Sequence, residues 1–247
     1  MEQIEDRVAV VTGAASGIGL AIADALAAVG CHLVVTDIDG EAVSAAADRI
    51  RARGTTVEAL QVDVRDPDAV DRAAATAVER LGAVNIAVNN AGVVNRGLSW
   101  ELSLEDWRRV LDVNLWGVIH GVRAFVPRIL SSGQEGHVVN IASMAAVQAM
   151  AKLGPYTVAK HGVLGLSDVL RAELEAVAPA VGVSVVMPGR IRTGMNPIGA
   201  IEPERVAANV LDAIVRRRPY VFTDDHSTDE VRMRLGAVVA ARDDVLR

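Results

Sequence analysis

Cysteine and aromatic residues are scarce in this chain. Cys31 is the one cysteine among 247 residues, and aromatic residues make up only 3% of them. A single cysteine allows neither an intrachain disulfide nor a zinc site built from thiolates, which fits a reducing compartment. With so few aromatic side chains, the core has to be built from alanine, valine, leucine and isoleucine. Such a core is typical of helices that pack closely on strands of β-branched residues.

Strong positive charge and long apolar runs are also absent. The formal net charge is −6, and there is no basic block beyond residues 216–218. We therefore expect neither nucleic acid nor an anionic membrane as the main partner. No uncharged apolar run reaches about 18 residues, so no transmembrane helix is expected. The N-terminal residues include Glu2, Glu5 and Asp6 rather than a basic region, so we expect no signal peptide and predict a cytoplasmic protein.

Two kinds of catalytic chemistry find no support in the sequence. The five histidines have no H-E-x-x-H or other ligand spacing, so we expect no bound metal. A G-x-S-x-G turn, which would carry an acyl-transfer serine, is missing as well.

Short apolar runs alternate with stretches of helical periodicity along the whole chain. The runs predict strands at residues 7–12, 32–37, 56–62, 84–88, 137–142, 182–187 and 219–223. The periodic stretches predict helices at residues 18–29, 41–53, 66–81, 104–130, from 155 onward, 202–217 and 231–239. Six or seven such alternations predict an α/β Rossmann fold, a doubly wound parallel sheet of six to seven strands with helices on both faces. Because no linker interrupts the pattern, we expect a single domain over residues 1–247, with residues 219–247 at a subunit contact.

A glycine-rich turn joins the first predicted strand to the first predicted helix. It reads Thr12-Gly13-x-x-x-Gly17-x-Gly19. Glycine permits the tight turn and the approach of backbone N–H groups to an anion, and the helix N-terminus adds a favourable dipole. A tight strand-to-helix turn alone would need the same glycines. With both flanking elements predicted, the turn indicates a site for a dinucleotide.

Asp37 closes the second predicted strand, about 18 residues beyond Gly19. A carboxylate at this point can accept hydrogen bonds from the ribose diol of an adenosine. It would repel a 2′-phosphate, and neither Ser16 nor Ile38 offers a compensating base, so we predict NAD rather than NADP. Alternatively, Asp37 serves only as a helix cap or turn carboxylate.

Many of the small and polar candidates fall at the ends of predicted strands. Ligands of such sheets bind outside the carboxyl ends of the strands. The candidates placed there are the turn 13–19, Asp37, Asp63, Asn90, Ser143 and Pro188.

Tyr156 and Lys160 stand four residues apart in a predicted helix that begins near Pro155. They share one helix face, and an ammonium near a phenol lowers its pKa from about 10. A phenol with an adjustable pKa suits acid–base catalysis on an alcohol or a carbonyl. The same pair also arises by chance on solvated helices.

Taken in order, these motifs resemble the short-chain dehydrogenase/reductase family over nearly the whole chain. The matching features are the glycine turn, Asn89-Asn90-Ala91-Gly92, Asn114, Ser143, Tyr156-x-x-x-Lys160, and Pro188-Gly189 with Thr193.

The resemblance implies four catalytic residues. Tyr156 would exchange a proton with the substrate oxygen, and Ser143 would hydrogen-bond that oxygen. Lys160 would hold the nicotinamide ribose and, with the oxidised nicotinamide, lower the pKa of Tyr156. Asn114 would hold a water that links Lys160 to solvent. Without the resemblance, Ser143 could be a strand-end cap and Asn114 a bridge to a neighbouring strand.

The resemblance also implies which residues contact the cofactor. These are Gly13, Ser16, Gly17, Ile18, Gly19, Asp37, Asp63, Val64, Asn90, Ala91, Gly92, Tyr156, Lys160, Pro188, Gly189, Ile191 and Thr193. Asp63 and Val64 would lie near the adenine, Asn90 near a ribose, and the last two near the carboxamide and pyrophosphate. The family is usually dimeric or tetrameric, so we expect a homo-oligomer.

The segment 194–201, here called the lid, is short compared with the lids that cover the substrate in relatives. A short lid suggests an open pocket or one completed by a second subunit. Arg190 and Arg192 precede it and could attract an acidic substrate group, neutralise cofactor phosphates or face solvent. We predict an apolar pocket wall made of Met144, Ala146, Val147, Met150, Leu153 and Met187.

These features favour an NAD-dependent dehydrogenase that interconverts a hydrophobic secondary alcohol and its ketone. A 3-oxoacyl thioester reductase is the alternative among enzymes, although it would be expected to use NADPH. A non-catalytic dinucleotide-binding regulator is the alternative outside them, and it would not need Tyr156.

Overall fold

The computed structural model describes residues 1, 3–223 and 228–245. Within them, seven parallel strands form one sheet in the order β3-β2-β1-β4-β5-β6-β7. The strands are β1 (Val8–Thr12), β2 (His32–Asp37), β3 (Val57–Gln61), β4 (Ile86–Asn89), β5 (Gly136–Ile141), β6 (Val181–Met187) and β7 (Tyr220–Phe222). The predicted doubly wound parallel sheet is confirmed.

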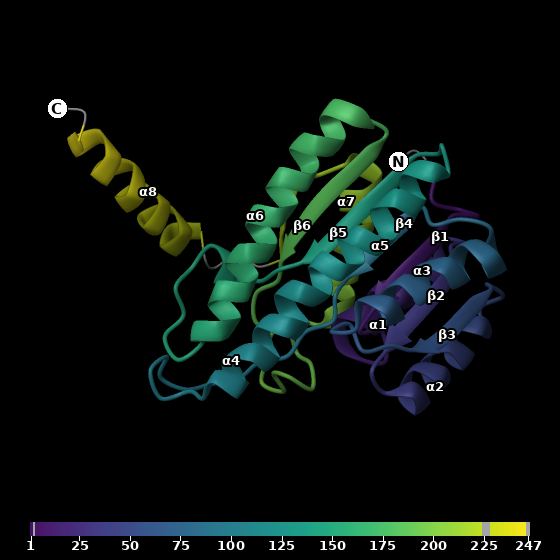
Figure 1. Ribbon diagram of the computed structural model, residues 1–247, viewed down its shortest axis with the longest axis horizontal. Coiled ribbons are helices and arrows are strands. Elements are labelled where there is room, and N and C mark those ends of the chain that lie inside the picture. Colours follow the sequence, from purple (N-terminus) through teal and green to yellow (C-terminus); the bar gives the residue numbers. More distant parts are fainter. Residues whose placement is uncertain (2, 224–227, 246–247) are drawn as a thin grey trace.

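Helices cover both faces of the sheet (Figure 1). They are α1 (Gly17–Ala28), α2 (Gly40–Arg51), α3 (Pro67–Leu81), α4 (Leu104–Leu111), α5 (Gly117–Ser131), α6 (Gly154–Val177), α7 (Pro203–Arg216) and α8 (Thr228–Val245). The first, second and seventh pack on one face, while α3, α5 and α6 pack on the other. The strand order reverses between β1 and β4, which is where sheets of this kind bind their ligands.

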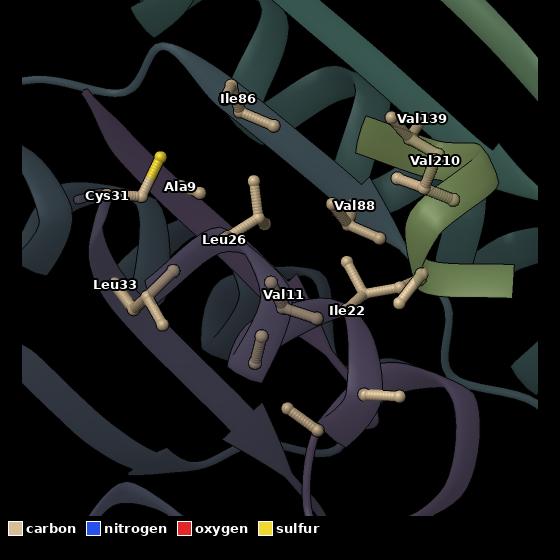
Figure 2. Close-up of a cluster of buried hydrophobic side chains, with 14 of the residues drawn as sticks. Ala9, Val11, Ile22, Leu26, Cys31, Leu33, Ile86, Val88, Val139 and Val210 are labelled. Carbon is tan, nitrogen blue, oxygen red and sulfur yellow. The ribbon is translucent and has the colours of Figure 1, made fainter. Parts of the chain in front are cut away.

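The core consists of small aliphatic side chains, as the lack of aromatic residues requires. On one face, alternate residues of β1 such as Ala9 and Val11 meet Ile22 and Leu26 of α1 (Figure 2). Cys31 is buried in this cluster, and burial raises the pKa of its thiol to about 12. A thiol held in its neutral form among apolar side chains contributes packing rather than chemistry.

The N-terminal caps of α3 and α2 show which carboxylates begin these helices. Asp66 caps α3 by accepting a hydrogen bond from Asp68 N at 2.9 Å, with Pro67 in the first turn. Asp39 caps α2 and accepts from Ala42 N at 3.0 Å. Asp37 is therefore not the helix cap, and its carboxylate remains at the end of β2.

One predicted helix is interrupted. The single helix expected over residues 104–130 is divided by a π-helical turn, Asp112–Trp116, between α4 and α5. Such turns occur often at functional sites, and this one contains Asn114. The apolar periodicity gave no sign of it, because a π turn adds a single residue to an otherwise helical pattern.

The C-terminal helix is longer than predicted. It spans Thr228–Val245 rather than residues 231–239, and it projects away from the sheet beyond α6 (Figure 1). Several of its apolar side chains, among them Met233 and Val238, are exposed. No described helix is both long and apolar enough to cross a bilayer. The expected extent of one domain over residues 1–247 stays a prediction.

Candidate active site

A cavity of about 1300 Å³ lies along the carboxyl edge of the sheet. This volume exceeds the roughly 300–1,000 Å³ typical of small-ligand pockets, so it can hold a ligand of dinucleotide size with a second molecule beside it. Nearly all the predicted site residues line it: Gly13, Ser16, Gly17, Ile18, Asp37, Asp63, Val64, Asn90, Ala91, Gly92, Ser143, Tyr156, Lys160, Pro188, Gly189, Ile191 and Thr193. Gly19 and Asn114 are behind this surface rather than on it.

The glycine turn fits an anion such as a pyrophosphate. Gly13 and Gly17 have φ of +65° and +56°, a conformation that favours glycine. A Cβ on Gly19 would come within 2.1 Å of Gly13 O, so the third glycine permits close packing of the turn on the helix. Ser16 makes no side-chain cap hydrogen bond to α1. The first-turn N–H groups of α1, which lack intrahelical partners, remain available to a ligand.

Asn90 holds the glycine turn in place. Its Nδ2 donates to Thr12 O at 2.8 Å and to Gly13 O at 3.0 Å. The backbone N–H of Asn90 donates to Thr12 Oγ1 at 2.9 Å. The amide predicted to lie near a ribose therefore also joins the end of β4 to the turn after β1, across the point where the strand order reverses.

The two predicted carboxylates of the cavity have different partners. Asp37 accepts hydrogen bonds from Ala15 N at 3.0 Å and from Asp39 N at 3.2 Å, and no described cation pairs with it. Asp63 is paired with Arg65 at 2.6 Å, and this hydrogen-bonded guanidinium lowers the pKa of the Asp63 carboxyl. Asp37 thus keeps its negative charge unneutralised at the cavity, while the charge of Asp63 is balanced.

Tyr156, Ser143 and Lys160 lie together as predicted. Burial raises the pKa of the Tyr156 phenol, and its hydrogen bond with Ser143 acts in the opposite direction. Ser143 Oγ also accepts from Ala145 N at 3.1 Å, so it caps the short turn that follows β5. The expected lowering of the Tyr156 pKa is therefore not present in the chain alone.

Lys160 lies beneath the phenol. Its Nζ is 5.7 Å from the Tyr156 ring centroid and donates to Ile141 O at 2.7 Å. The side chain is 3% exposed, and this burial lowers the pKa of Lys160 to about 8. One of the three ammonium protons is thus used to fix the side chain on the end of β5, and the others remain for a ligand.

Asn114 is fully buried behind the cavity. Its Oδ1 accepts from Val93 N at 2.7 Å, and its Nδ2 donates to Val93 O at 2.8 Å. The side chain is thereby committed to the loop that follows β4, which is the structural alternative considered from the sequence.

The lid is tied at its base. Arg192 N donates to Ile201 O at 2.7 Å, and the Arg192 guanidinium contacts Glu202 at 3.2 Å and Gly199 O at 3.2 Å. Arg192 does not line the cavity, whereas Arg190 does. Of the two arginines singled out from the sequence, only Arg190 can touch a substrate.

The apolar part of the cavity was predicted only in part. Met144, Met150 and Leu153 line it, together with Met195, Pro197 and Ile198 of the lid. The inclusion of Ala146, Val147 and Met187 was wrong, because these side chains are buried in a core cluster beside α6. Of the residues in the turn after Ser143, Met144 lines the cavity, whereas Ala146 and Val147 do not.

Three polar residues of the cavity wall were missed. Arg96 follows the β4 motif, Gln148 follows the turn after Ser143, and Glu230 comes from the first turn of α8. Gln148 Nε2 donates to Glu230 Oε2 at 2.7 Å. The position of Arg96 soon after a strand end was a usable signal, but nothing local in the sequence indicates that α8 returns to the cavity. In the part of the chain that is described, no three His, Cys, Asp or Glu side chains form a group suited to a metal.

Comparisons with known proteins agree with this geometry. A family profile described as "short chain dehydrogenase" matches residues 7–199. The chain is 40% identical over 245 residues to the 1-deoxy-11-beta-hydroxypentalenate dehydrogenase of Streptomyces exfoliatus, covering 94% of this chain and 86% of that protein.

Solved structures show the same fold. A short-chain dehydrogenase/reductase of Burkholderia phymatum in complex with NAD superposes with a TM-score of 0.95 at 32% identity, over 98% of this chain and 97% of that one. A short-chain dehydrogenase of Mycobacterium paratuberculosis bound to NAD gives a TM-score of 0.85 at 29% identity, over 92% and 99% of the two chains. The chain belongs to the short-chain dehydrogenase/reductase family of oxidoreductases.

Proposed function

We propose that the protein is an NAD-dependent dehydrogenase that interconverts a largely hydrophobic secondary alcohol and its ketone. The observation that carries this proposal is that Tyr156, Ser143 and Lys160 line the same cavity as the glycine turn, with Lys160 Nζ 5.7 Å from the centroid of the Tyr156 ring. The similar Streptomyces protein, named as a hydroxypentalenate dehydrogenase, supports action on a hydroxyl group.

Tyr156 is the proton carrier in this proposal. In the reduction of a ketone its phenol gives a proton to the substrate oxygen, and in the oxidation of an alcohol its phenolate takes that proton. The bound nicotinamide supplies the acceptor or donor of the hydride. Because burial raises the pKa of Tyr156, the phenol is protonated in the chain alone and is ready to donate.

The neighbouring residues orient the reacting groups. Ser143, which lines the cavity with Tyr156, would hold the substrate oxygen and stabilise the charge that develops on it. Lys160 would offer its remaining protons to a ribose and bring positive charge close to the phenol. Asn114, whose side chain is used by Val93, would support a water only through its main chain.

Asp37 is the basis for proposing NAD over NADP. Its carboxylate lies on the cavity without a cation beside it, and the next residue, Ile38, is apolar and 59% exposed. The 2′-phosphate of NADP would be repelled by the Asp37 carboxylate, and no positively charged side chain of the described residues pairs with this carboxylate. Two structural relatives were crystallised with NAD, which agrees with this choice.

A fluorescence titration with NADH and with NADPH tests the proposal. We expect the wild type to bind NADH at least about tenfold more tightly, and Asp37→Asn to reduce this preference, because the carboxamide still accepts from Ala15 N but carries no charge. Asp39→Asn is the matched control, since that carboxylate caps α2 outside the cavity. A wild-type preference for NADPH would favour the 3-oxoacyl thioester reductase, and failure to bind either nucleotide would overturn the enzyme assignment.

The substrate, the oligomeric state and the location of the protein are predicted as follows. A small-molecule alcohol or ketone is the partner of the cavity, and a homo-oligomer is expected. The exposed apolar residues of α8 suit a subunit contact. A cytoplasmic location is the expectation from the sequence alone.

A further inference from the structure

Two arginines line the cavity without a charged partner. Arg96 lies in the loop after β4, and Arg190 lies in the loop after β6. Within the described residues neither forms an ion pair. Other arginines nearby are neutralised, since Arg65 pairs with Asp63 and Arg192 with Glu202. Among the arginines that line the cavity, Arg96 and Arg190 thus carry charges that no described carboxylate balances.

Both arginines are tied to the catalytic end of the cavity rather than to the Asp37 end. Gly97, next to Arg96, donates its N–H to Lys152 O at 3.0 Å and bridges to Leu153, just before Tyr156. Met144, next to Ser143, donates its N–H to Pro188 O at 3.1 Å, two residues before Arg190. The loops that carry the two arginines are therefore hydrogen-bonded to the segment just before Tyr156 and to the residue after Ser143.

Glu230, the acidic side chain in this part of the cavity wall, does not neutralise the charges of Arg96 and Arg190. Glu230 accepts a hydrogen bond from Gln148 and makes no ion pair with Arg96 or Arg190. The rest of this region is apolar, formed by Met144, Met150, Leu153 and Ile198. A ligand that fills the space would satisfy the guanidinium groups only if it brought an anionic group of its own.

We propose that the substrate is a hydrophobic hydroxy acid or oxo acid, whose carboxylate is bound by Arg190 and Arg96 while its hydroxyl or ketone oxygen meets Tyr156 and Ser143. A guanidinium matches a carboxylate through two parallel hydrogen bonds, which fixes orientation as well as charge. The apolar side chains hold the carbon skeleton between the two ends. This inference names a substrate class for the proposed alcohol dehydrogenase and rests on that function.

Binding of an inert probe tests the inference apart from catalysis. Calorimetry of the NADH-loaded protein with cyclohexanecarboxylate and with cyclohexanecarboxamide compares an anion with a neutral molecule of the same shape. We expect the carboxylate to bind about tenfold more tightly or better, as a charge-assisted hydrogen bond implies. Arg190→Gln and Arg96→Gln should each remove most of this preference, and the double variant all of it.

Arg192→Gln is the matched control, because it removes an arginine two residues from Arg190 that faces Glu202 instead of the cavity. It should keep the preference for the carboxylate. Equal or weaker binding of the carboxylate in the wild type, including no measurable binding of either probe, would overturn the inference. Equal losses for both probes in Arg190→Gln would do the same, because they would indicate altered shape rather than lost charge.

Turnover separates this inference from the proposed function. With 3-hydroxycyclohexanecarboxylate and its methyl ester, we expect kcat/KM to favour the acid, and Arg190→Gln to raise KM for the acid roughly 10- to 100-fold with little effect on the ester. Oxidation of acid and ester with equal kcat/KM would leave the dehydrogenase intact and reject the hydroxy acid. Arginine-dependent binding of the carboxylate without oxidation of any alcohol would retain the anion site and reject the dehydrogenase.

Discussion

The two walls of the cavity are built differently. The cofactor wall consists of the turn 13–19, residues 37–38, residues 63–64 and residues 90–92, and hydrogen bonds between strand ends hold it before any ligand binds. The substrate wall consists of Arg96, Gln148, Met150, Leu153, Arg190, residues 194–198 and Glu230. Its side chains are longer, and the two arginines have no ion-pair partner among the described residues.

The contrast has a physical basis. A pyrophosphate is recognised by backbone N–H groups, which require a fixed main chain, so the cofactor wall is defined by glycine and by short amides. A substrate is recognised by shape and a few charges, which side chains on loops can supply. Substitutions that disturb the main chain of the first wall should therefore cost stability and cofactor affinity together, whereas those in the second should alter substrate kinetics alone.

The largest expected effect is the loss of turnover on substitution of Tyr156, which lies between the two walls. Tyr156→Phe removes the proton carrier and leaves the ring in place, so we expect kcat to fall by about 10²- to 10⁴-fold. Because the phenol hydroxyl is not part of the cofactor wall, NADH affinity should change little. Steady-state kinetics and a fluorescence titration measure the two quantities.

Tyr220→Phe is the control, since Tyr220 is the other tyrosine of the chain and bonds Asp168 outside the cavity. Its kcat should match the wild type. Full activity of Tyr156→Phe would contradict the assigned proton carrier and would favour a regulator that binds the dinucleotide without turning it over.

The next effect falls on the cofactor wall. Gly19→Ala would bring a methyl group within 2.1 Å of Gly13 O, and the turn would have to move. We expect a loss of about 1–3 kcal/mol in the free energy of unfolding, as for other overpacked sites, with a loss of NADH affinity of about tenfold or more. Urea unfolding and nucleotide titration measure them.

Gly165→Ala provides the opposite case. A Cβ at Gly165 meets nothing within 4 Å, and the residue lies inside α6. The substitution should raise the free energy of unfolding by about 0.5–1 kcal/mol, because alanine favours a helix interior. If Gly19→Ala were equally harmless, the close packing of the turn would have no role.

The cofactor wall could be predicted from the sequence because its residues act locally. Gly13, Gly17, Asp37 and Asn90 each stand at the end of an apolar run, and parallel strands bring their carboxyl ends to one edge. The period of the apolar residues gave the strand count as well. What the pattern did not give is the hydrogen bonding of Asn90, which depends on the distance between two strand ends.

The substrate wall could be predicted only in part because its members are placed by tertiary structure. Glu230 lies on the cavity only because of where α8 is placed, and Arg190 differs from Arg192 only in the direction its loop gives it. Ala146 and Met144 stand two residues apart and share one core cluster, yet only Met144 also lines the cavity. Residue type alone does not tell which of these side chains line the cavity, because the backbone of the loop decides where each one points.

The opposite edge of the sheet holds a buried polar group that faces no cavity. His137 in β5 bonds Ser184 at 2.8 Å, and burial lowers the pKa of its imidazole from 6.5 to about 3. Below about pH 6.5 the unfolded chain binds a proton that the folded chain does not, so stability should fall as pH drops toward 3, by up to about 1.4 kcal/mol per unit.

Urea unfolding at several pH values between about 7.5 and 5 measures this slope. The variant His137→Gln cannot titrate and should show a flatter dependence, while His32→Gln, a substitution elsewhere in the sheet, should keep the wild-type slope. Parallel curves for the wild type and His137→Gln would exclude His137 as the source. If His137→Gln flattens the pH dependence of stability but leaves the affinity for NADH unchanged, burial of His137 contributes to the fold and not to cofactor binding.

The smallest effects should separate the two walls most cleanly. Ile38 and Ile198 are both exposed, by 59% and 79%, and both line the cavity, the first beside Asp37 and the second in the lid. Truncation of so exposed a side chain should change the free energy of unfolding by no more than about 0.5 kcal/mol. Ile38→Ala should then weaken the binding of NADH a few-fold without changing the KM of the alcohol, and Ile198→Ala should raise the KM of the alcohol without changing the binding of NADH.

Each variant loses the same three methyl and methylene carbons. A difference in which ligand is affected can therefore come only from the wall that carries the residue. If both variants changed cofactor and substrate binding alike, the cavity would behave as one continuous surface, and its division into two walls would have to be abandoned.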